Sequence, residues 1–284
     1  IIFLIIGSVL LLNFIHCIGF LKLSLVESFR PSLSFCITCK NRLIQIKQTL
    51  RKNLEDNRRE GDSIEFVLVD FGSTDGLQEW LEENFFEDIE SGYLNCYYTD
   101  ELPYWHASVA KNTAHFWAKN DIVVNLDCDN FTGPKGGKFI IDMMMKYGQH
   151  HTFIHQFSNE IGDGSFGRIA ISRKNFFMMG GYDESLGPYG YEDVNLLQRL
   201  WLKGYTYIHL PDKKYCKAIP NTKTEGISNV DTDLEWWQLI ENSRRKSLEN
   251  ITSGKLLANK NKGHVGIISN IHKIVVTDDE FSNE

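Results

Sequence analysis

The sequence predicts an α/β fold in which a mostly parallel sheet is flanked by helices. Short apolar runs alternate along the chain with stretches of helical periodicity, which is typical of parallel strands joined by right-handed crossover helices. One run, at 122–126, ends abruptly in the carboxylates Asp127 and Asp129. Open α/β sheets bind ligands at the carboxyl ends of their strands, so this is a candidate site. The length of 284 residues allows one large domain of this kind or two small ones.

The first half of the chain contains apolar runs whose short length indicates buried strands. They lie at 32–38, 64–69, 94–98 and 122–126, and helical patterns at 43–54, 77–83 and 107–118 separate them. The turn GSTDG follows the second run, and Ser73 or Thr74 is expected to cap the helix behind it. The second half continues with a helix at 138–147 and strands at 152–156 and 168–172.

A glycine-rich stretch at 180–193 then leads into a helix at 194–203, which Gly204 ends. A last short strand is expected at 205–209, before Pro211, and an amphipathic helix near 234–248. The chain from Asn259 onward is expected to be a loosely held tail.

Composition narrows the class of partner. The chain is 42% hydrophobic and 24% charged, with a formal net charge of −7, and no basic stripe of the kind that binds nucleic acid stands out. An anionic nucleotide would therefore need local cations or a metal. Cys36 and Cys39 form a CxxC without a second copy, so a structural zinc site is not expected. A redox pair stays open, and the simpler interpretation is two small apolar residues on a buried first strand.

The N-terminal stretch 1–21 is strongly apolar and close to the length of a membrane-spanning helix. A membrane anchor, a signal sequence and a mis-extended start are competing interpretations, with the anchor slightly favoured. The expected organisation is an apolar N-terminal segment at 1–27, a single α/β domain at 28–230, and a helix with a polar tail at 231–284. The protein would then be membrane-associated through the anchor, or cytoplasmic without it.

Asp127 and Asp129 carry the chemical argument. At positions i and i+2 after a buried strand, two carboxylates converge on one side of the chain and repel each other. A divalent cation removes that conflict, and an all-oxygen site suits magnesium or manganese. A chain this rich in charge also holds Asp-x-Asp by chance. A second copy, Asp231 and Asp233, follows no apolar run and is expected on a solvated turn.

Five stretches together resemble the GT-A glycosyltransferases, closest to family 2 and with a galactosyltransferase-like C-terminal motif. They are CITCKNR (36–42), LVDFGSTDG (68–76), ASVAKN (107–112), LDCDN (126–130) and GGYDESLGPYGYEDVNLLQRL (180–200). The resemblance implies a single GT-A catalytic domain with a Rossmann-like sheet. It also implies transfer of a hexose or N-acetylhexosamine from a nucleoside-diphosphate sugar, with a UDP-sugar preferred, to a glycan acceptor. Mn²⁺ or Mg²⁺ is the implied cofactor.

The same resemblance assigns a set of residues to the donor: Thr38, Asn41, Arg42, Asp70, Ser73, Lys111 and Asp127. Arg42 suits a diphosphate, Lys111 can reach a phosphate as a point charge, and Asp70 can accept from the N3–H of uracil. Phe71 stands where the family usually has a second acid. Local alternatives remain: a capping turn for Asn41, helix capping for the GSTDG turn, and an exposed, solvated side chain for Lys111.

The metal and acceptor residues are assigned in the same way. Asp127 and Asp129 match the family's DxD motif, with Asp129 as the more direct ligand. Asn221 stands where many relatives have a metal-binding histidine, so His209 is the nearest candidate for a third ligand. Asp193 matches the base that deprotonates the acceptor hydroxyl in an inverting transfer, and Glu192 is expected to bind the acceptor or share that role.

The setting of these acids favours chemistry over a purely structural role. Acids in a helix's first turn also stabilise its dipole, but that role does not account for the glycines before them. The glycines let the backbone approach a sugar, and three aromatic side chains are expected to stack on sugar rings: Tyr182, Tyr189 and Tyr191.

Two other functions fit the sequence less well. A nucleotidyltransferase on a similar fold needs a glycine-rich phosphate loop after the first strand, and CKNR lacks the glycines. A non-catalytic glycan-binding relative would have lost the metal or base carboxylates, and this chain keeps both.

Overall fold

A computed structural model describes residues 30–58, 63–160, 163–260 and 265–276. The apolar N-terminal segment and its expected anchor lie outside these residues. No helix in the part of the chain that is described is both long and apolar enough to cross a membrane. From Pro31 onward the chain forms one compact unit.

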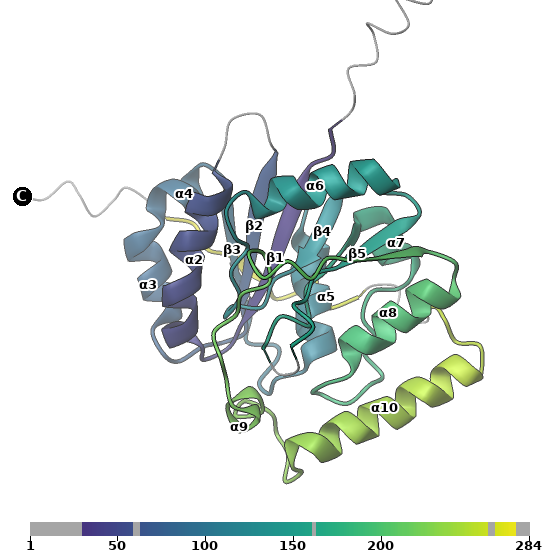
Figure 1. Cartoon of the computed structure of the whole chain (residues 1–284). Coiled ribbons are helices and arrows are strands. Elements are labelled where there is room, and N and C mark those ends of the chain that lie inside the picture. Colours follow the sequence, from purple (N-terminus) through teal and green to yellow (C-terminus); the bar gives the residue numbers. More distant parts are fainter. Residues whose placement is uncertain (1–29, 59–62, 161–162, 261–264, 277–284) are drawn as a thin grey trace, which may run out of the picture. The chain divides into compact units, whose positions relative to one another are not determined.

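The sheet confirms the predicted fold class. Its order is β7-β5-β6-β4-β1-β2-β3-β8 (Figure 1). Strands β1 to β4 pair in parallel in the centre and β5 pairs in parallel with β7, while β6 and β8 run antiparallel to their neighbours. The strands are β1 (Leu33–Cys39), β2 (Ile64–Asp70), β3 (Leu94–Tyr98), β4 (Ile122–Asn125), β5 (Thr152–His155), β6 (Ile169–Ser172), β7 (Thr206–His209) and β8 (His272–Lys273).

Helices cover both faces of this sheet. One face packs against α2, α3 and α6, and the other against α5, α7 and α8. Helix α10 lies alongside α8 (Figure 1), where Asn195 donates to the Ser247 hydroxyl at 2.9 Å. The helices are α2 (Leu43–Asn57), α3 (Leu77–Asn84), α4 (Phe86–Glu90), α5 (Ala107–Trp117), α6 (Gly136–Tyr147), α7 (Arg173–Met178), α8 (Glu192–Leu202), α9 (Lys223–Gly226) and α10 (Trp236–Thr252).

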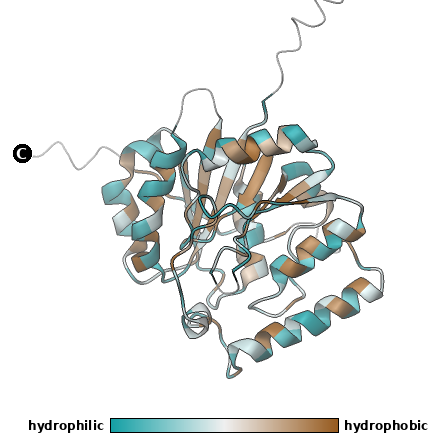
Figure 2. Ribbon diagram, viewed as in Figure 1, coloured by the Kyte–Doolittle hydropathy of each residue, from teal (hydrophilic) through white to brown (hydrophobic). Residues whose placement is uncertain are grey.

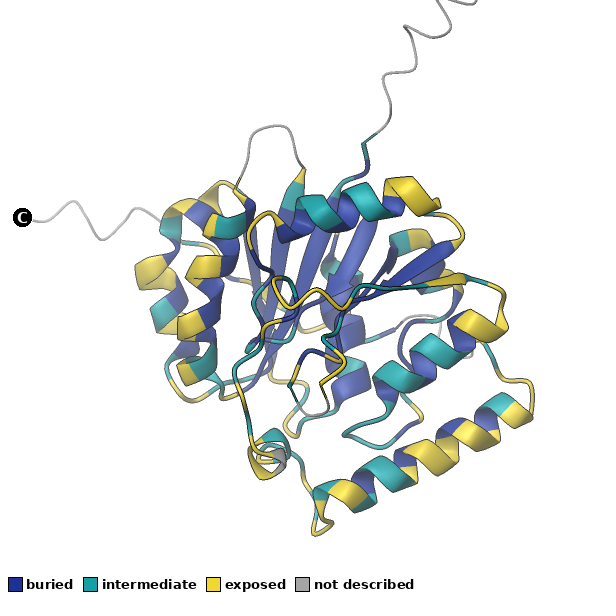
Figure 3. Cartoon of the chain, in the orientation of Figure 1, coloured by how far each residue is buried: buried dark blue, intermediate teal, exposed yellow. Residues whose placement is uncertain are grey.

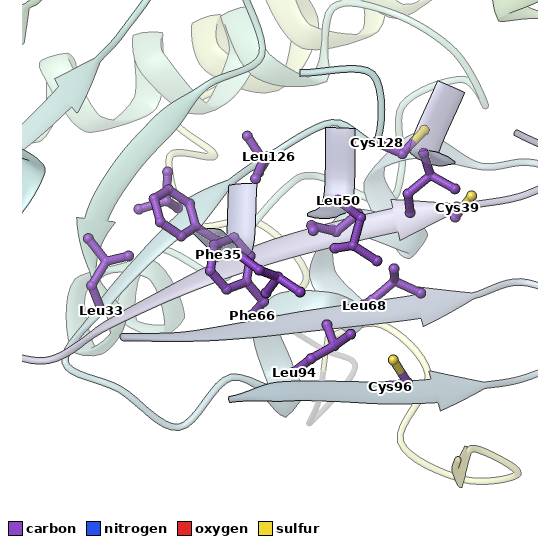
Figure 4. Packing of buried hydrophobic residues seen from close by; sticks show 14 of the residues in the cluster. Leu33, Phe35, Cys39, Leu50, Phe66, Leu68, Leu94, Cys96, Leu126 and Cys128 are labelled. Atoms are coloured by element: carbon purple, nitrogen blue, oxygen red, sulfur yellow. The ribbon is translucent and has the colours of Figure 1, made fainter. Parts of the chain in front are cut away.

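The strand period of two divides the core between these faces. Phe35 and Phe66 stack at 5.0 Å on the side of α2, where Leu50 joins them (Figure 4). Strands β1 to β6 are mostly apolar and buried, whereas β7 and β8 at the two edges of the sheet are more exposed, and the outer sides of the helices are polar and exposed (Figures 2 and 3). Cys36 and Cys39 belong to the two opposite clusters and are free thiols. They are small apolar core residues, as expected, and not a redox pair.

The GSTDG turn differs from its prediction. The N-cap of α3 is Gly76, and neither Ser73 nor Thr74 caps that helix. The turn serves α2 instead, because Asp75 Oδ2 accepts from the Leu43 N–H at 2.8 Å. Asn41, with φ of 52°, accepts from the Thr74 N–H at 2.8 Å. The turn therefore ties the β1–α2 loop in place.

The C-terminal stretch is also more ordered than predicted. Asn259 donates to the carbonyls of Gly180 and Tyr182 at 2.8 and 2.6 Å. Beyond it, β8 pairs with β3, and Ile274 is buried in the core. The expectation of a loosely held tail from Asn259 is therefore wrong for the described residues up to 276. A two-residue strand has too few side chains to show a period in the sequence.

Candidate active site

Parallel pairing brings the predicted site residues to one edge of the sheet. Strands β1 and β4 are neighbours, so the residues that follow them meet at their carboxyl ends. The N-terminus of α8 faces the same place across a cleft of about 600 Å³. Seven of the predicted residues line this cleft: Thr38, Arg42, Lys111, Asp127, Asp129, Glu192 and Asp193.

The other donor-side predictions do not line the cleft. Asp70 is only 1% exposed. Its Oδ1 accepts from the Ser73 N–H at 2.9 Å, and its Oδ2 is buried without a hydrogen-bond partner among the described residues. Ser73 accepts from the backbone N–H of Asn41 at 2.9 Å. These three residues hold two loops together, and the expected contact between Asp70 and a base is not available in this conformation.

Other residues line the cleft near the end of β2, where Asp70 was expected to contact the base. Phe71, which replaces the second acid, is fully buried and packs edge-on against Trp105 at 5.9 Å. Trp105 and Lys40 line the cleft, and the Lys40 ammonium donates to the Phe71 carbonyl at 2.5 Å. Asn229, which follows α9, donates to the Lys40 carbonyl at 3.0 Å. Sequence reasoning missed Asn229 because no motif links it to β1.

The Asp127/Asp129 pair has the character of a cation site. Asp127 Oδ1 accepts from Asn125 Nδ2 at 3.0 Å. Asp129 Oδ2 lies 3.7 Å from the Arg42 guanidinium and contacts the amide nitrogen of Asn221. Burial, and then the charge of Asp127, raise the pKa of Asp129 to about 6. Two neighbouring carboxylates that repel each other electrostatically are suitable oxygen ligands for Mn²⁺ or Mg²⁺.

His209 does not join this pair. Its Nε2 lies 3.1 Å from the Phe157 carbonyl, its ring packs against Phe157, and it does not line the cleft. No cluster of three or more His, Cys, Asp or Glu within the described ranges could hold a metal. The prediction of His209 as the third ligand is therefore wrong, because β7 lies at the far edge of the sheet from β1. The chain offers the two aspartates.

Lys111 pairs with Glu192 and Asp193 and not with the other residues that were predicted to bind the donor. It projects from α5, and its ammonium contacts Glu192 Oε1 at 2.8 Å and the two carboxylate oxygens of Asp193 at 2.8 and 2.9 Å. All three side chains are largely buried. Lys111 is therefore not an exposed, solvated side chain. Its ammonium is engaged by the two acids and is not available for the predicted contact to a phosphate. It holds both acids in fixed positions at the start of α8.

The acid Asp193 also has an unusual affinity for its proton. Burial raises its pKa to about 7, against the lowering influence of the Lys111 ammonium, while the charges of Glu192 and Asp127 raise it further. A carboxylate with a pKa near the working pH is suited to accept a proton and to release it again.

Gly167 joins the two halves of the site. A Cβ atom on this glycine would lie 2.8 Å from Asp127 Oδ2 and 3.1 Å from Asp193 Oδ2. The two carboxylates therefore converge on the same backbone position, just before β6. This convergence could not be predicted from a local pattern, because Gly167 lies in none of the recognised motifs. Any larger residue would occupy the space between the carboxylates of Asp127 and Asp193.

We therefore expect Gly167→Ala to lower kcat/KM by on the order of 100-fold, since a displacement of about 1 Å in a catalytic group has effects of this size. Alanine fits the backbone here, because Gly167 is not among the positive-φ glycines. Gly187→Ala is the matched control: its Cβ meets Ser243 Oγ at 2.8 Å, away from the cleft lining. It should keep kcat/KM near that of wild type. Equal losses in both variants would contradict the role of Gly167.

The predicted aromatic residues divide into two groups. Tyr189 and Tyr191 line the cleft and are available to a sugar. Tyr182 is fully buried, and its ring lies 5.3 Å from the Lys111 ammonium. The prediction that Tyr182 stacks on a sugar is therefore wrong. The motif alone did not predict that Tyr182 is buried. Its burial follows a backbone turn at Gly180 and Gly181, both of which have positive φ.

Comparison with known proteins identifies the family of this chain. Residues 34–186, more than half of the chain, match Glycosyl transferase family 2. The chain belongs to this family, and it is a glycosyltransferase with the GT-A fold. A search of curated proteins found no match.

Solved structures share the fold at low identity. The mannosyltransferase PcManGT of Pyrobaculum calidifontis, in complex with GDP-Man and Mn²⁺, is 20% identical with a TM-score of 0.50, over 65% of this chain and 56% of that chain. S. aureus TarS 1–349, in complex with UDP, is 16% identical with a TM-score of 0.53, over 78% and 72%. GalNAc-T7 with UDP, GalNAc and Mn²⁺ is 15% identical with a TM-score of 0.54, over 65% and 42%.

Proposed function

We propose that the protein transfers a hexose or N-acetylhexosamine from a UDP-sugar to a glycan acceptor, with inversion at the anomeric carbon and with a divalent cation. The observation that carries the proposal is the convergence of Asp127 and Asp193 on Gly167. This convergence places Asp127, on the donor side, close to Asp193, the proposed base for the acceptor hydroxyl. A single displacement requires the two sides to be close together.

The donor side is formed by the loops after β1 and β4. Arg42 lies on the cleft side of Asp129, where a guanidinium can contact a diphosphate. Asp127 and Asp129 hold the cation, with Mn²⁺ as the first choice and Mg²⁺ as the second. When bound, the cation supplies Lewis-acid neutralisation of the departing nucleoside diphosphate. Mn²⁺ with GDP-Man or UDP in two of the similar structures supports this assignment.

The acceptor side is formed by the start of α8. Asp193 takes the proton of the acceptor hydroxyl as that oxygen attacks the anomeric carbon. Lys111 keeps Asp193 and Glu192 in place, and Glu192 is assigned to acceptor hydroxyls. Tyr189 and Tyr191 provide apolar faces for the sugar rings and exclude water from the cleft.

A donor screen tests the proposal. UDP- and GDP-sugars are incubated with the protein and MnCl₂, and release of the nucleoside diphosphate is measured with and without a mixture of oligosaccharide acceptors. We expect release from a UDP-sugar, faster with acceptor. Release from GDP-sugars alone would contradict the choice of uridine, and no release from any donor would contradict the proposed transfer.

The pH dependence follows from Asp193. Its pKa is raised to about 7, and only the deprotonated carboxylate can accept a proton. We therefore expect kcat, at saturating donor, acceptor and metal, to be highest above pH 7 and to fall about tenfold per pH unit below it. A kcat that stays constant from pH 8 to pH 5 would show that Asp193 does not limit the reaction.

A further inference from the structure

We propose that Arg168 is a positioning residue for the divalent cation, acting through Asn130: it fixes the Asn130 amide, which in turn fixes the carboxylate of Asp129. The inference rests on the cation site proposed above. Neither Arg168 nor Asn130 touches the cleft, and both are almost completely buried, at 2% and 1% exposed.

The Asn130 side chain is held at both ends. Its Oδ1 accepts from the Arg168 guanidinium at 2.7 Å. Its Nδ2 donates to Asp129 Oδ1 at 2.7 Å and to the Gly164 carbonyl at 3.2 Å. Turning the amide over would set its oxygen against a carboxylate and a carbonyl, and its NH₂ group against a guanidinium, which only donates. The amide therefore has one stable orientation, in which Arg168 holds its oxygen while its NH₂ group is directed at Asp129.

This orientation gives the two carboxylate oxygens of Asp129 different contacts. Oδ1 is committed to Asn130, so Oδ2 is the oxygen offered to the cleft, where Arg42 and Asn221 meet it. The Asn221 amide is held differently. Its Nδ2 contacts Asp129 and the Ile219 carbonyl at 3.1 Å, and no donor in the described residues fixes its Oδ1. It can turn when a cation approaches, while Asn130 cannot.

Arg168 is itself well anchored. Its second guanidinium nitrogen donates to the carbonyl of Tyr215. In the sequence, Arg168 lies between Gly167 and the first residue of β6. A buried guanidinium is costly to desolvate, and burial lowers the pKa of Arg168 to about 10. A neutral residue would fill the space at lower cost, which indicates that the rigid fork of donors has a purpose here.

Electrostatics and positioning predict opposite effects, which makes the inference testable. Arg168 is a cation close to a cation site, so its charge alone disfavours metal binding. If charge were its only influence, Arg168→Gln would bind Mn²⁺ more tightly. If Arg168 orients Asp129 through Asn130, Arg168→Gln will bind Mn²⁺ more weakly, by about tenfold or more, as loss of a residue that supports a metal ligand does.

The experiment measures Mn²⁺ alone, by the loss of the free Mn²⁺ signal in EPR titrations of the full chain, so that it depends on no nucleotide. The variants are Arg168→Gln, Asn130→Leu and the double variant. We expect each single variant to weaken binding about tenfold and the double variant to be no weaker, because the two residues act in one chain of contacts. Arg199→Gln is the matched control, since Arg199 is also buried and bonded to an asparagine, Asn195, at 2.7 Å.

Arg199→Gln should lower the melting temperature but keep the Mn²⁺ affinity of wild type. If Arg168→Gln does not fold, Asn130→Leu carries the test, because it leaves the contact between Arg168 and Tyr215 intact. Affinity that is unchanged or higher in a folded Arg168→Gln or Asn130→Leu variant would overturn the proposal, and so would additive losses in the double variant. The proposal also requires that the wild-type protein binds Mn²⁺ and that Asp129→Asn abolishes this binding. If either is not observed, the proposal is overturned. Nucleotide release from sugar donors reports separately on the proposed transfer.

Discussion

Asp193→Asn is expected to lower kcat by about 10²- to 10⁴-fold, the usual contribution of a general base, while UDP affinity changes little. The reason is geometric. The proposed donor contacts come from the loops after β1 and β4, whereas Asp193 lies in the first turn of α8. An amide keeps the shape of the side chain and one acceptor for the Lys111 ammonium, but it cannot take the acceptor's proton. Initial rates and UDP titration calorimetry separate the two quantities.

Glu192→Gln is the control for this variant. Glu192 shares Lys111 with Asp193 and is also largely buried, so the substitution disturbs the same ion pair without removing the proposed base. It should raise the KM for the acceptor more than it lowers kcat. An Asp193→Asn variant with wild-type turnover would count against the assignment and move the base to Glu192, and a comparable loss of UDP affinity would also count against it.

The second large effect is expected at the cation site. Asp129→Asn should cost several kcal/mol of transition-state stabilisation, on the order of a thousandfold in kcat/KM, because a Lewis acid is lost from the leaving group. EDTA should have a similar effect on wild type, reversed by added Mn²⁺. Nucleotide release and product formation measure both.

The chain contains its own control for this substitution. Asp231 and Asp233 repeat the Asp-x-Asp spacing, but both are exposed and follow α9 in an irregular segment, as the sequence indicated. Asp231→Asn should leave kcat/KM close to wild type. Full turnover of wild type in EDTA would remove the metal from the mechanism, and equal losses in Asp129→Asn and Asp231→Asn would show a general effect of charge.

The sequence predicted most of the fold because the elements that form it carry their own signals. Strands β1 to β4 are short, mainly apolar runs, and Asp127 and Asp129 mark the carboxyl end of β4. The predicted start of α8 was only two residues late, because its acids and the preceding glycines are local features. Once the strands were placed as parallel neighbours, the joint location of Thr38 and Asp127 followed from topology.

The errors concern contacts between segments that are distant in the sequence. Asp70 was assigned to the base because it ends β2, but the Ser73 N–H and the surrounding core enclose it. Lys111 was assigned to a phosphate, because nothing in its own motif shows that α8 brings two acids to it. Gly167 and Arg168 belong to the site only because the fold brings the turn before β6 beside Asp127 and Asn130. Side-chain partners of this kind are set by packing and not by local pattern.

The anomeric configuration of the first product tests the proposed mechanism most directly. The protein is incubated with an α-linked UDP-sugar found active in the donor screen, an oligosaccharide acceptor and MnCl₂, and the new linkage is read by ¹H NMR before any product can equilibrate. A single displacement assisted by Asp193 predicts a β-linkage, inverted relative to the donor. A product that retains the α-configuration would contradict the single displacement and with it the role of Asp193 as the base.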